Sequence, residues 1–200
     1  MPRDATATRE RLIREAERLF ARRGVWQVTV RDITTAAGQR NASVIHYHFG
    51  SLEGLRQTIL EYHGLPMDVE RVDHLAAIEG EPTDRDLIDA LLVPYGRSLA
   101  TPEGRDYVRI VAQYTGFFGS WDSTPGSPHL IDILCRLRDG QKHLDPEIRE
   151  QRILGIVILI SGAMGERAKH LDDGDEPMID HERFVSNLAS MLVAALEAPG

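Results

Sequence analysis

Apolar residues recur at every third or fourth position through nearly the whole chain, which is the spacing of one face of an α-helix. The pattern is clearest near the start, where Leu12, Ala16 and Leu19 form a stripe and Gly24 follows as a helix-ending residue. No segment alternates apolar and polar residues over a useful length, and no internal repeat is present. The sequence therefore predicts an all-α protein of about nine helices.

Turn and capping residues divide this pattern into segments. Residues 1–7 are expected to form a loose arm. The helix that begins after Ser51 is expected to break at Gly64 and Pro66, because proline cannot continue the hydrogen bonds of a helix. Residues 119–128 are rich in Gly, Ser and Pro and predict a loop. The predicted helices are 8–23, 30–37, 42–48, 52–63 with a second piece at 68–79, 85–100, 102–118, 128–142, 146–170 and 179–197.

Two short helices separated by a tight turn are predicted between residues 29 and 49. Thr29 suits the N-cap of the first helix, with Asp32 three residues later as the acidic partner of a capping box. Gly38 stands where that helix must stop, at a position that favours left-handed backbone. Asn41 can cap the second helix. A helix-turn-helix of this kind can bind DNA, although two helices joined by a Gly turn can also be a plain αα-hairpin in a core.

The second helix has an inner and an outer side at 100° per residue. Ala42, Ile45 and Phe49 are expected to face the core. Ser43, Val44 and Tyr47 are expected to point outward, with His46 and His48 on opposite flanks. Small polar and aromatic side chains of this kind can reach base edges and phosphates in a DNA major groove.

The net charge of the whole chain is −8, which does not by itself suggest a DNA-binding protein. The charge is, however, unevenly distributed along the sequence. Residues 1–56 carry a net charge of +4, and residues 57–200 carry −12. Positive charge is therefore confined to the segment with the two short helices, where a phosphate-binding surface needs it. We predict a DNA-binding domain at 1–56 and a second helical domain at 57–200.

The same segment resembles the helix-turn-helix of the TetR/AcrR family of bacterial transcriptional regulators. The matching residues are Thr29–Ile33, Ala36–Gly38 and Tyr47–Ser51, followed by Glu53 and Leu55. The strong resemblance covers about residues 8–60. In two departures, the turn is one residue longer than usual, and Leu52 stands where the family has a phosphate-binding Lys.

The resemblance implies a homodimeric regulator that binds a palindromic operator on double-stranded DNA and that is released by a small molecule in the C-terminal domain. A repressor is the expected type. The predicted base contacts are Arg40, Asn41, Ser43, Val44 and His46, and the predicted phosphate contacts are Thr29, Tyr47, His48 and Ser51.

The last two helices are the candidates for dimerisation. The helix at 146–170 is apolar over more than one face and contains glycines, which cost about 1 kcal/mol each inside a helix and suggest close approach of another helix. Two such pairs would form a four-helix bundle, although a central core helix of a monomer is the alternative. The predicted interface residues are Gly155, Leu159, Gly162, Phe184, Leu188, Met191 and Leu192.

Aromatic, histidine and sulfur-containing side chains from several helices could line a pocket for an apolar or aromatic effector. They could equally be plain core. The candidates are Tyr62, His63, Tyr95, Tyr114, Phe117, Phe118, Trp121, Cys135 and Met164.

Other classes of protein fit the sequence less well. No catalytic or metal-binding motif is present, so neither an enzyme nor a cofactor is expected. Cys135 is the only cysteine, and no signal peptide or membrane-spanning run is recognisable, which suits the cytoplasm. A sequence-tolerant architectural protein would be basic overall. The remaining alternative is a TetR-like protein that has no small-molecule inducer and is controlled by a protein partner.

Overall fold

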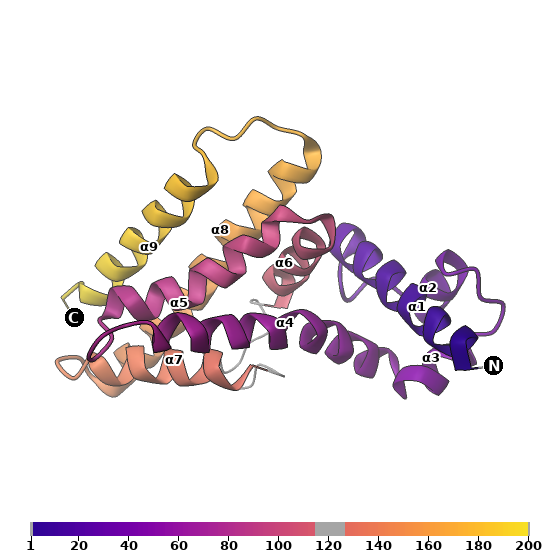
Figure 1. Ribbon diagram of the computed structural model, residues 1–200, viewed down its shortest axis with the longest axis horizontal. Helices are drawn as coiled ribbons and strands as arrows, with labels where there is room; N and C mark the ends of the chain where they lie inside the picture. The colour runs from indigo at the N-terminus through magenta and orange to yellow at the C-terminus, as the bar shows by residue number, and fades with distance from the viewer. Residues whose placement is uncertain (1, 115–126, 200) are drawn as a thin grey trace.

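The computed structural model describes residues 2–114 and 127–199 and confirms the all-α prediction (Figure 1). These residues form nine α-helices and one short 3₁₀-helix, with no strand among them. The elements are α1 (Pro2–Arg23), α2 (Val30–Ala36), α3 (Ser43–Phe49), α4 (Leu52–Ala76), α5 (Asp84–Arg97), η1 (Ser98–Ala100), α6 (Pro102–Tyr114), α7 (Pro128–Gly140), α8 (Pro146–Asp173) and α9 (His181–Glu197).

Two predicted boundaries are wrong. The expected loose arm is helical from Pro2, because a helix anchored by a buried stripe extends into adjacent residues one hydrogen bond at a time. The expected break in α4 is absent, and the helix runs through Pro66. Pro66 lies on the exposed side of α4, so water can satisfy the carbonyl of Tyr62 that the proline cannot bond. Gly64 and Met67 beside it are buried and hold the helix on the opposite side.

One hydrophobic core lies at the N-terminal end and defines what we call the head, namely α1–α3 with residues 52–60 of α4. Its fully buried side chains are Leu12, Phe20, Ile33, Ile45, Leu55 and Ile59 from the head itself, with Ile110 from α6. The second core belongs to the body, formed by the rest of α4 with α5–α9. Leu60 packs against both cores, close to the predicted domain boundary at residues 56 and 57.

Helix α6 joins the two parts, because it packs on α1 of the head and on α8 of the body (Figure 1). A Cβ atom at Gly165 of α8 would lie 2.7 Å from the Cβ of Ala112, so the close helix approach expected at the α8 glycines occurs here. Gly155 and Gly162 have nothing within 4 Å of such a Cβ atom. Those two glycines therefore have no neighbouring helix within the described part of this chain.

Side-chain contacts also fix the head on the body. The Gln113 amide of α6 accepts a hydrogen bond from the Val25 N–H at 2.7 Å and donates to the Phe20 carbonyl at 3.1 Å. His63 of α4 contacts the buried carboxylate of Glu17 at 2.8 Å and stacks on Tyr107 of α6. Three helices therefore meet through polar contacts at the joint.

Candidate nucleic-acid interface

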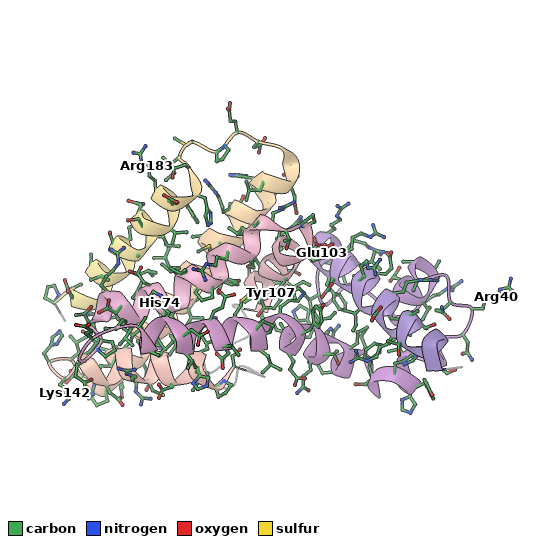
Figure 2. The ribbon with its side chains drawn as sticks, viewed as in Figure 1. Arg40, His74, Glu103, Tyr107, Lys142 and Arg183 are labelled. Carbon is green, nitrogen blue, oxygen red and sulfur yellow. The ribbon has the colours of Figure 1, made fainter. Side chains whose placement is uncertain are left out.

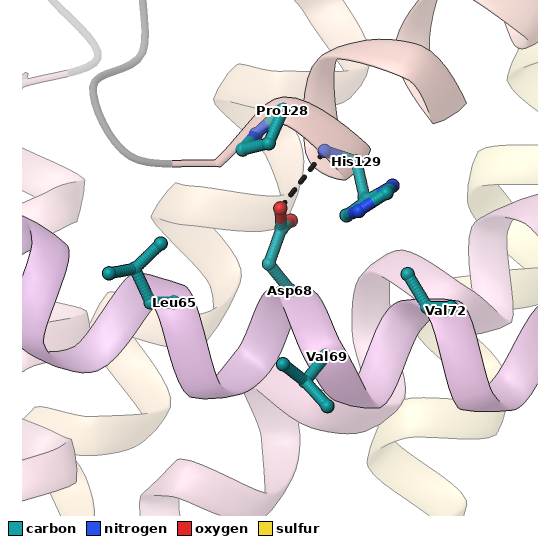
Figure 3. Close-up of a pocket in the computed structure, with 6 residues that line it drawn as sticks. All are labelled: Leu65, Asp68, Val69, Val72, Pro128 and His129. Carbon is teal, nitrogen blue, oxygen red and sulfur yellow. Dashed lines mark hydrogen bonds between the residues drawn. The ribbon is translucent and has the colours of Figure 1, made fainter.

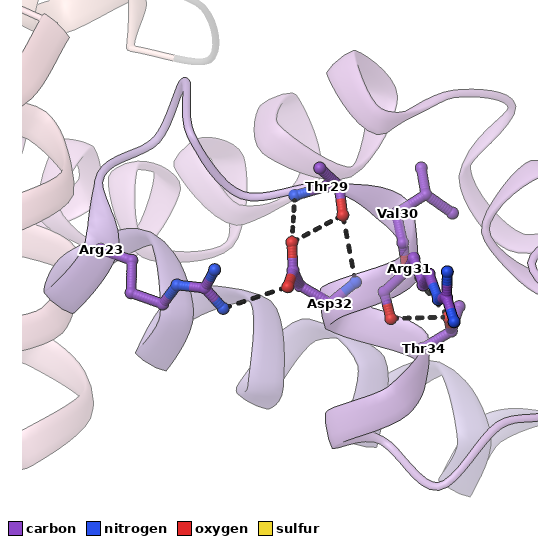
Figure 4. A network of polar contacts seen from close by, with 6 residues as sticks. All are labelled: Arg23, Thr29, Val30, Arg31, Asp32 and Thr34. Atoms are coloured by element: carbon purple, nitrogen blue, oxygen red, sulfur yellow. Dashed lines mark hydrogen bonds and ion pairs between the residues drawn. The ribbon is translucent and has the colours of Figure 1, made fainter.

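The first helix of the motif is fixed by the predicted capping box. The Thr29 hydroxyl accepts a hydrogen bond from the Asp32 N–H, and the Asp32 carboxylate accepts from both the backbone N–H and the hydroxyl of Thr29 (Figure 4). Arg23 of α1 pairs with the same carboxylate at 3.1 Å. The Thr29 hydroxyl is the main reason that the pKa of Asp32 falls from 3.8 to about 2. Asp32 therefore keeps its charge, and hence the α2 cap, throughout the physiological pH range.

The turn between the two helices follows the prediction with a shift of one residue. Gly38 has the expected left-handed backbone, with a φ of 68°. The Asn41 side chain accepts a hydrogen bond from the Ser43 N–H at 2.9 Å, so it does satisfy the start of α3. The N-cap position itself is Ala42, which is exposed and does not face the core as predicted. Ala42 lies before the first turn of α3, where the angular pattern of the helix no longer applies.

Helix α3 buries a different set of residues from the one predicted. Ile45 is fully buried in the head, and Phe49 is half-buried beneath the guanidinium of Arg9. Val44 was predicted to point outward, but it is half-buried against the head core. Tyr47 is 78 % exposed. The outward face of α3 therefore carries Tyr47 together with exposed Ser43 and His46.

The junction between α3 and α4 contains two glycines with different structural roles. Gly50 ends α3 with a φ of 75°, and its carbonyl lies 2.5 Å from Nδ1 of His46. Gly54 lies in the first turn of α4, where an added Cβ would stand 2.0 Å from the Phe49 carbonyl oxygen. Only glycine allows the two helices to approach this closely. Sequence reasoning missed Gly54, although a glycine in a first helical turn is itself a signal.

The start of α4 is capped as predicted, since the Ser51 hydroxyl accepts a hydrogen bond from the Gly54 N–H at 2.9 Å. Leu52 packs partly buried against the head core. Leu52 therefore makes an apolar packing contact at the start of α4.

Arg56 stabilises the packing around the motif, and sequence reasoning did not identify this residue. Its guanidinium lies 4.7 Å from the Trp26 ring centroid and 5.7 Å from that of Phe20. It donates to the Val25 carbonyl at 2.9 Å and pairs with Glu53. Arg56 therefore ties the loop before α2 to α4, through partners 30 residues or more away in sequence, which no local pattern reveals.

The nine predicted DNA contacts all come from α3, the turn before it and the N-caps of α2 and α4, at the end of the molecule far from α7 and α9 (Figure 1). Arg40 projects from the turn at the tip (Figure 2). Val44 and His48 are half-buried, and the exposed ones are Thr29, Arg40, Asn41, Ser43, His46, Tyr47 and Ser51.

Only some of the residues predicted for the dimer interface are exposed. Gly155, Leu159 and Gly162 share an exposed face of α8, and Met191 is exposed on α9. Leu188 and Leu192 are instead buried in the body core, so that part of the prediction is wrong. They lie on the buried stripe of α9, which packs on α5 and α8 of the same chain.

Phe184, also predicted for the dimer surface, is half-buried in α9. The guanidinium of Arg167 from α8 covers its ring at 4.9 Å. Ile158, which was not predicted, is 47 % exposed on α8 beside Leu159.

The candidate pocket residues that the structure describes do not gather around one cavity. Tyr62 is 65 % exposed, whereas Tyr95 and Met164 are in the body core. Tyr114 packs against Trp26 of the head, and burial raises its pKa to about 12. His63 belongs to the joint between head and body, and Cys135 is half-buried on α7, where burial raises the pKa of its thiol. Phe117, Phe118 and Trp121 lie outside the described residues.

A cavity of about 300 Å³ lies instead between α4 and the start of α7 (Figure 3). Its lining is mostly apolar and consists of Leu65, Asp68, Val69, Val72, Pro128 and His129. The buried Asp68 carboxylate accepts hydrogen bonds from the backbone N–H groups of His129 and Leu130, at 2.9 and 3.0 Å. Asp68 therefore caps α7 from α4 and holds the wall of the cavity in place.

Comparison with known proteins agrees with this geometry. The sequence profile of the bacterial regulatory proteins of the tetR family matches residues 12–59. No curated protein matches the sequence. In addition, no helix of the described residues is long and apolar enough to cross a membrane.

Solved structures share the fold over almost the whole chain. A TetR family transcription regulator from Marinobacter aquaeolei VT8 is 15 % identical with a TM-score of 0.59, covering 98 % of each chain. A protein assigned to the TetR family from Rhodococcus sp. is 17 % identical with a TM-score of 0.55, covering 96 % of this chain and all of that one. A γ-butyrolactone receptor, described as ArpA-like, is 22 % identical with a TM-score of 0.50, covering 94 % of this chain and 97 % of that one.

Proposed function

Because this chain belongs to the TetR family of bacterial regulatory proteins, with the family's DNA-binding domain at residues 12–59, we propose that it is a transcriptional repressor that binds a palindromic operator as a homodimer. A small apolar molecule bound in the body releases it from the operator. It acts in the cytoplasm, where the operator is, and it has no catalytic role.

The observation that carries the proposal is the position and exposure of the motif. Ser43, His46 and Tyr47 are exposed on α3, which lies at the end of the molecule, with Arg40 projecting beside it (Figure 2). Residues 1–56 carry the net positive charge, and the acidic remainder lies mostly in the body. This separation lets the head approach DNA phosphates while the body is held away from them.

Selection from a pool of random duplexes tests operator binding. We expect the wild-type protein to enrich a palindrome with two half-sites, because a two-fold dimer presents two copies of α3. Arg40→Ala should weaken binding to the selected duplex, whereas the control Arg183→Ala removes the same charge from α9 and should leave binding unchanged. The proposal fails if no sequence is enriched at low salt.

The dimer is supported by the exposed face of α8. Gly155 and Gly162 leave that face flat, with no neighbour within 4 Å of a Cβ at either position. Ile158 and Leu159 are exposed beside them. A second copy of α8 and α9 would cover these side chains in a four-helix bundle. The chain offers the partner a flat apolar surface.

Sedimentation measurements test the dimer. Ile158→Glu would bury a charge in the interface, so it should give a monomer and abolish binding to the full palindrome. Met178→Glu is the matched control, because Met178 is a fully exposed apolar residue outside this face. Equal sedimentation of the two variants would argue against an interface at α8.

We propose that the effector binds in the cavity between α4 and the start of α7. Leu65, Val69 and Val72 offer an apolar wall, and α4 continues from this wall into the head. A ligand that moved α4 would therefore move α3, and the two half-site contacts would no longer match the operator spacing.

Release of a labelled operator duplex tests the effector site. Alkyl γ-butyrolactones are the first probes, because one structure with this fold is a γ-butyrolactone receptor. Val69→Trp should fill the cavity and remove the response, while Ile148→Trp adds the same ring at an exposed site on α8 outside the cavity lining. A probe that releases both variants equally would exclude this cavity. Failure of every apolar probe would favour control by a protein partner.

A further inference from the structure

The end of α3 fixes which nitrogen of His46 carries a proton. Nδ1 of His46 lies 2.5 Å from the carbonyl oxygen of Gly50. A carbonyl oxygen can only accept a hydrogen bond, so a contact at this distance requires a proton on Nδ1. In the neutral imidazole, the other nitrogen, Nε2, then has a free lone pair and is an acceptor.

Gly50 supplies this carbonyl through its own backbone conformation. Its φ is 75°, in the region that side chains other than that of glycine rarely adopt. This left-handed turn ends α3 and brings the Gly50 carbonyl back toward the side chain one turn earlier. The Gly50 N–H meanwhile bonds the His46 carbonyl at 2.9 Å. His46 and Gly50 are therefore linked twice, through backbone and side chain, and the imidazole has a defined orientation.

Nε2 is left available to a ligand. His46 is exposed, and no hydrogen bond from Nε2 to another described residue is present. The neighbouring Tyr47 ring packs against His48, so it does not cover His46 from that side. An exposed acceptor with a fixed direction on α3 is a feature that could distinguish one base from another.

We propose that His46 selects a base that presents an amino group in the major groove, adenine or cytosine, by accepting a hydrogen bond from it at Nε2. This inference rests on the proposed operator binding. In the major groove only adenine N6 and cytosine N4 are hydrogen-bond donors, while guanine and thymine present acceptors at the equivalent edge. Phosphate oxygens are acceptors as well, so the same nitrogen is not suited to the DNA backbone. A histidine can donate or accept at either ring nitrogen, but the contact with Gly50 fixes Nε2 of His46 as the acceptor. His46 can therefore determine specificity at one base.

The test begins with the duplex selected by the wild-type protein. The affinity for all four base pairs is measured at each half-site position, for wild type and for His46→Asn. The asparagine amide can still donate to the Gly50 carbonyl from a position close to that of Nδ1, but it has no counterpart of Nε2. We expect one position at which wild type prefers one base pair over the others by about 2- to 12-fold, the range for one neutral hydrogen bond, which the adenine or cytosine of that pair donates. His46→Asn should lose that preference alone.

Removal of the amino group from the DNA completes the test. At the responding position, adenine is replaced by purine, or cytosine by 2-pyrimidinone, each of which lacks only the amino group. The affinity of wild type should fall by the same factor as in the base-pair comparison. The affinity of His46→Asn should not change when the amino group is removed. Thermal unfolding of the variant should match wild type, which separates the effect from misfolding.

Three results would overturn the inference while leaving the proposed function intact. These are a selected palindrome with no position that responds to His46→Asn, a responding position at which wild type loses no affinity when the amino group is removed, and equal losses for both proteins when the amino group is removed. If wild type enriches no duplex at all, the proposed function fails, and this inference fails with it.

Discussion

The interaction between Asp68 and Arg71 makes a prediction that can be worked out in detail. Asp68 accepts hydrogen bonds from two N–H groups at the start of α7 and from Arg71 at 3.1 Å. Both side chains of the ion pair are about 5 % exposed. Ser127, the N-cap residue of α7, makes no side-chain cap of its own. Replacement of Asp68 by Asn therefore removes the charge that offsets Arg71 and weakens the side-chain cap that α7 receives from α4.

The expected cost follows from these contacts. Removing one partner of a buried ion pair lowers the free energy of unfolding by about 3–5 kcal/mol, because the other charge remains buried without compensation. Loss of an N-cap alone costs about 1 kcal/mol. Asp68→Asn should therefore be destabilised by about 3–5 kcal/mol. The double variant Asp68→Asn, Arg71→Met removes the uncompensated charge and should recover about 2–3 kcal/mol of that loss.

Urea unfolding followed by far-ultraviolet circular dichroism measures these free energies. Protein concentration must be the same for every variant, because dimerisation would add to the apparent stability. The sign of the second substitution is decisive. If Arg71→Met destabilises the Asp68→Asn protein further, the unpaired charge is not the main cause of the lost stability and the reasoning is refuted.

Three other perturbations have expected outcomes. Gly54→Ala places a Cβ 2.0 Å from the Phe49 carbonyl oxygen, so it should cost about 1–3 kcal/mol by thermal unfolding and weaken DNA binding; Gly140→Ala, with ordinary contacts at 3.7 Å, is the control. The pKa of Asp32 is lowered from 3.8 to about 2, so its stabilising effect is complete above pH 3.8 and is lost as pH falls toward 2. Unfolding curves of wild type and Asp32→Asn should therefore converge near pH 2, and a constant difference would contradict this. Burial raises the pKa of Tyr107 from 10.0 to about 12, so the folded protein should lose stability as pH rises from 10 toward 12. Tyr107→Phe should remove that part of the alkaline loss, as measured by unfolding at successive pH values, and an unchanged slope would argue against it.

The helix-turn-helix could be predicted closely from sequence because its determinants are local. The Thr29 capping box and the Ser51 cap each join groups three residues apart, and Gly38 acts through its own φ angle. Contacts of this range are present in the order of the residues, and no distant partner has to be known. The same holds for the helical periodicity, which predicted the fold class.

The sites in the body could not be predicted in the same way. Leu188 and Leu159 are both apolar residues on apolar helices, yet one is buried in the core and the other lies on the open face of α8. The helical period says that a helix has an apolar side, but not which neighbour covers it. Where two sides of a helix are apolar, only the packing of the other helices decides which one remains exposed.

What the sequence determined by itself was therefore the all-α fold, the helix-turn-helix and the charge division between the two ends of the chain. Only the tertiary structure decided the continuity of α4 through Pro66, the cap that Asp68 provides to α7 and the support of the motif by Arg56 and Gln113. Each of these depends on groups about 30 to 90 residues apart, or on which side of a helix faces water. Those relations arise when helices pack together, and the spacing of residues along the chain does not contain them.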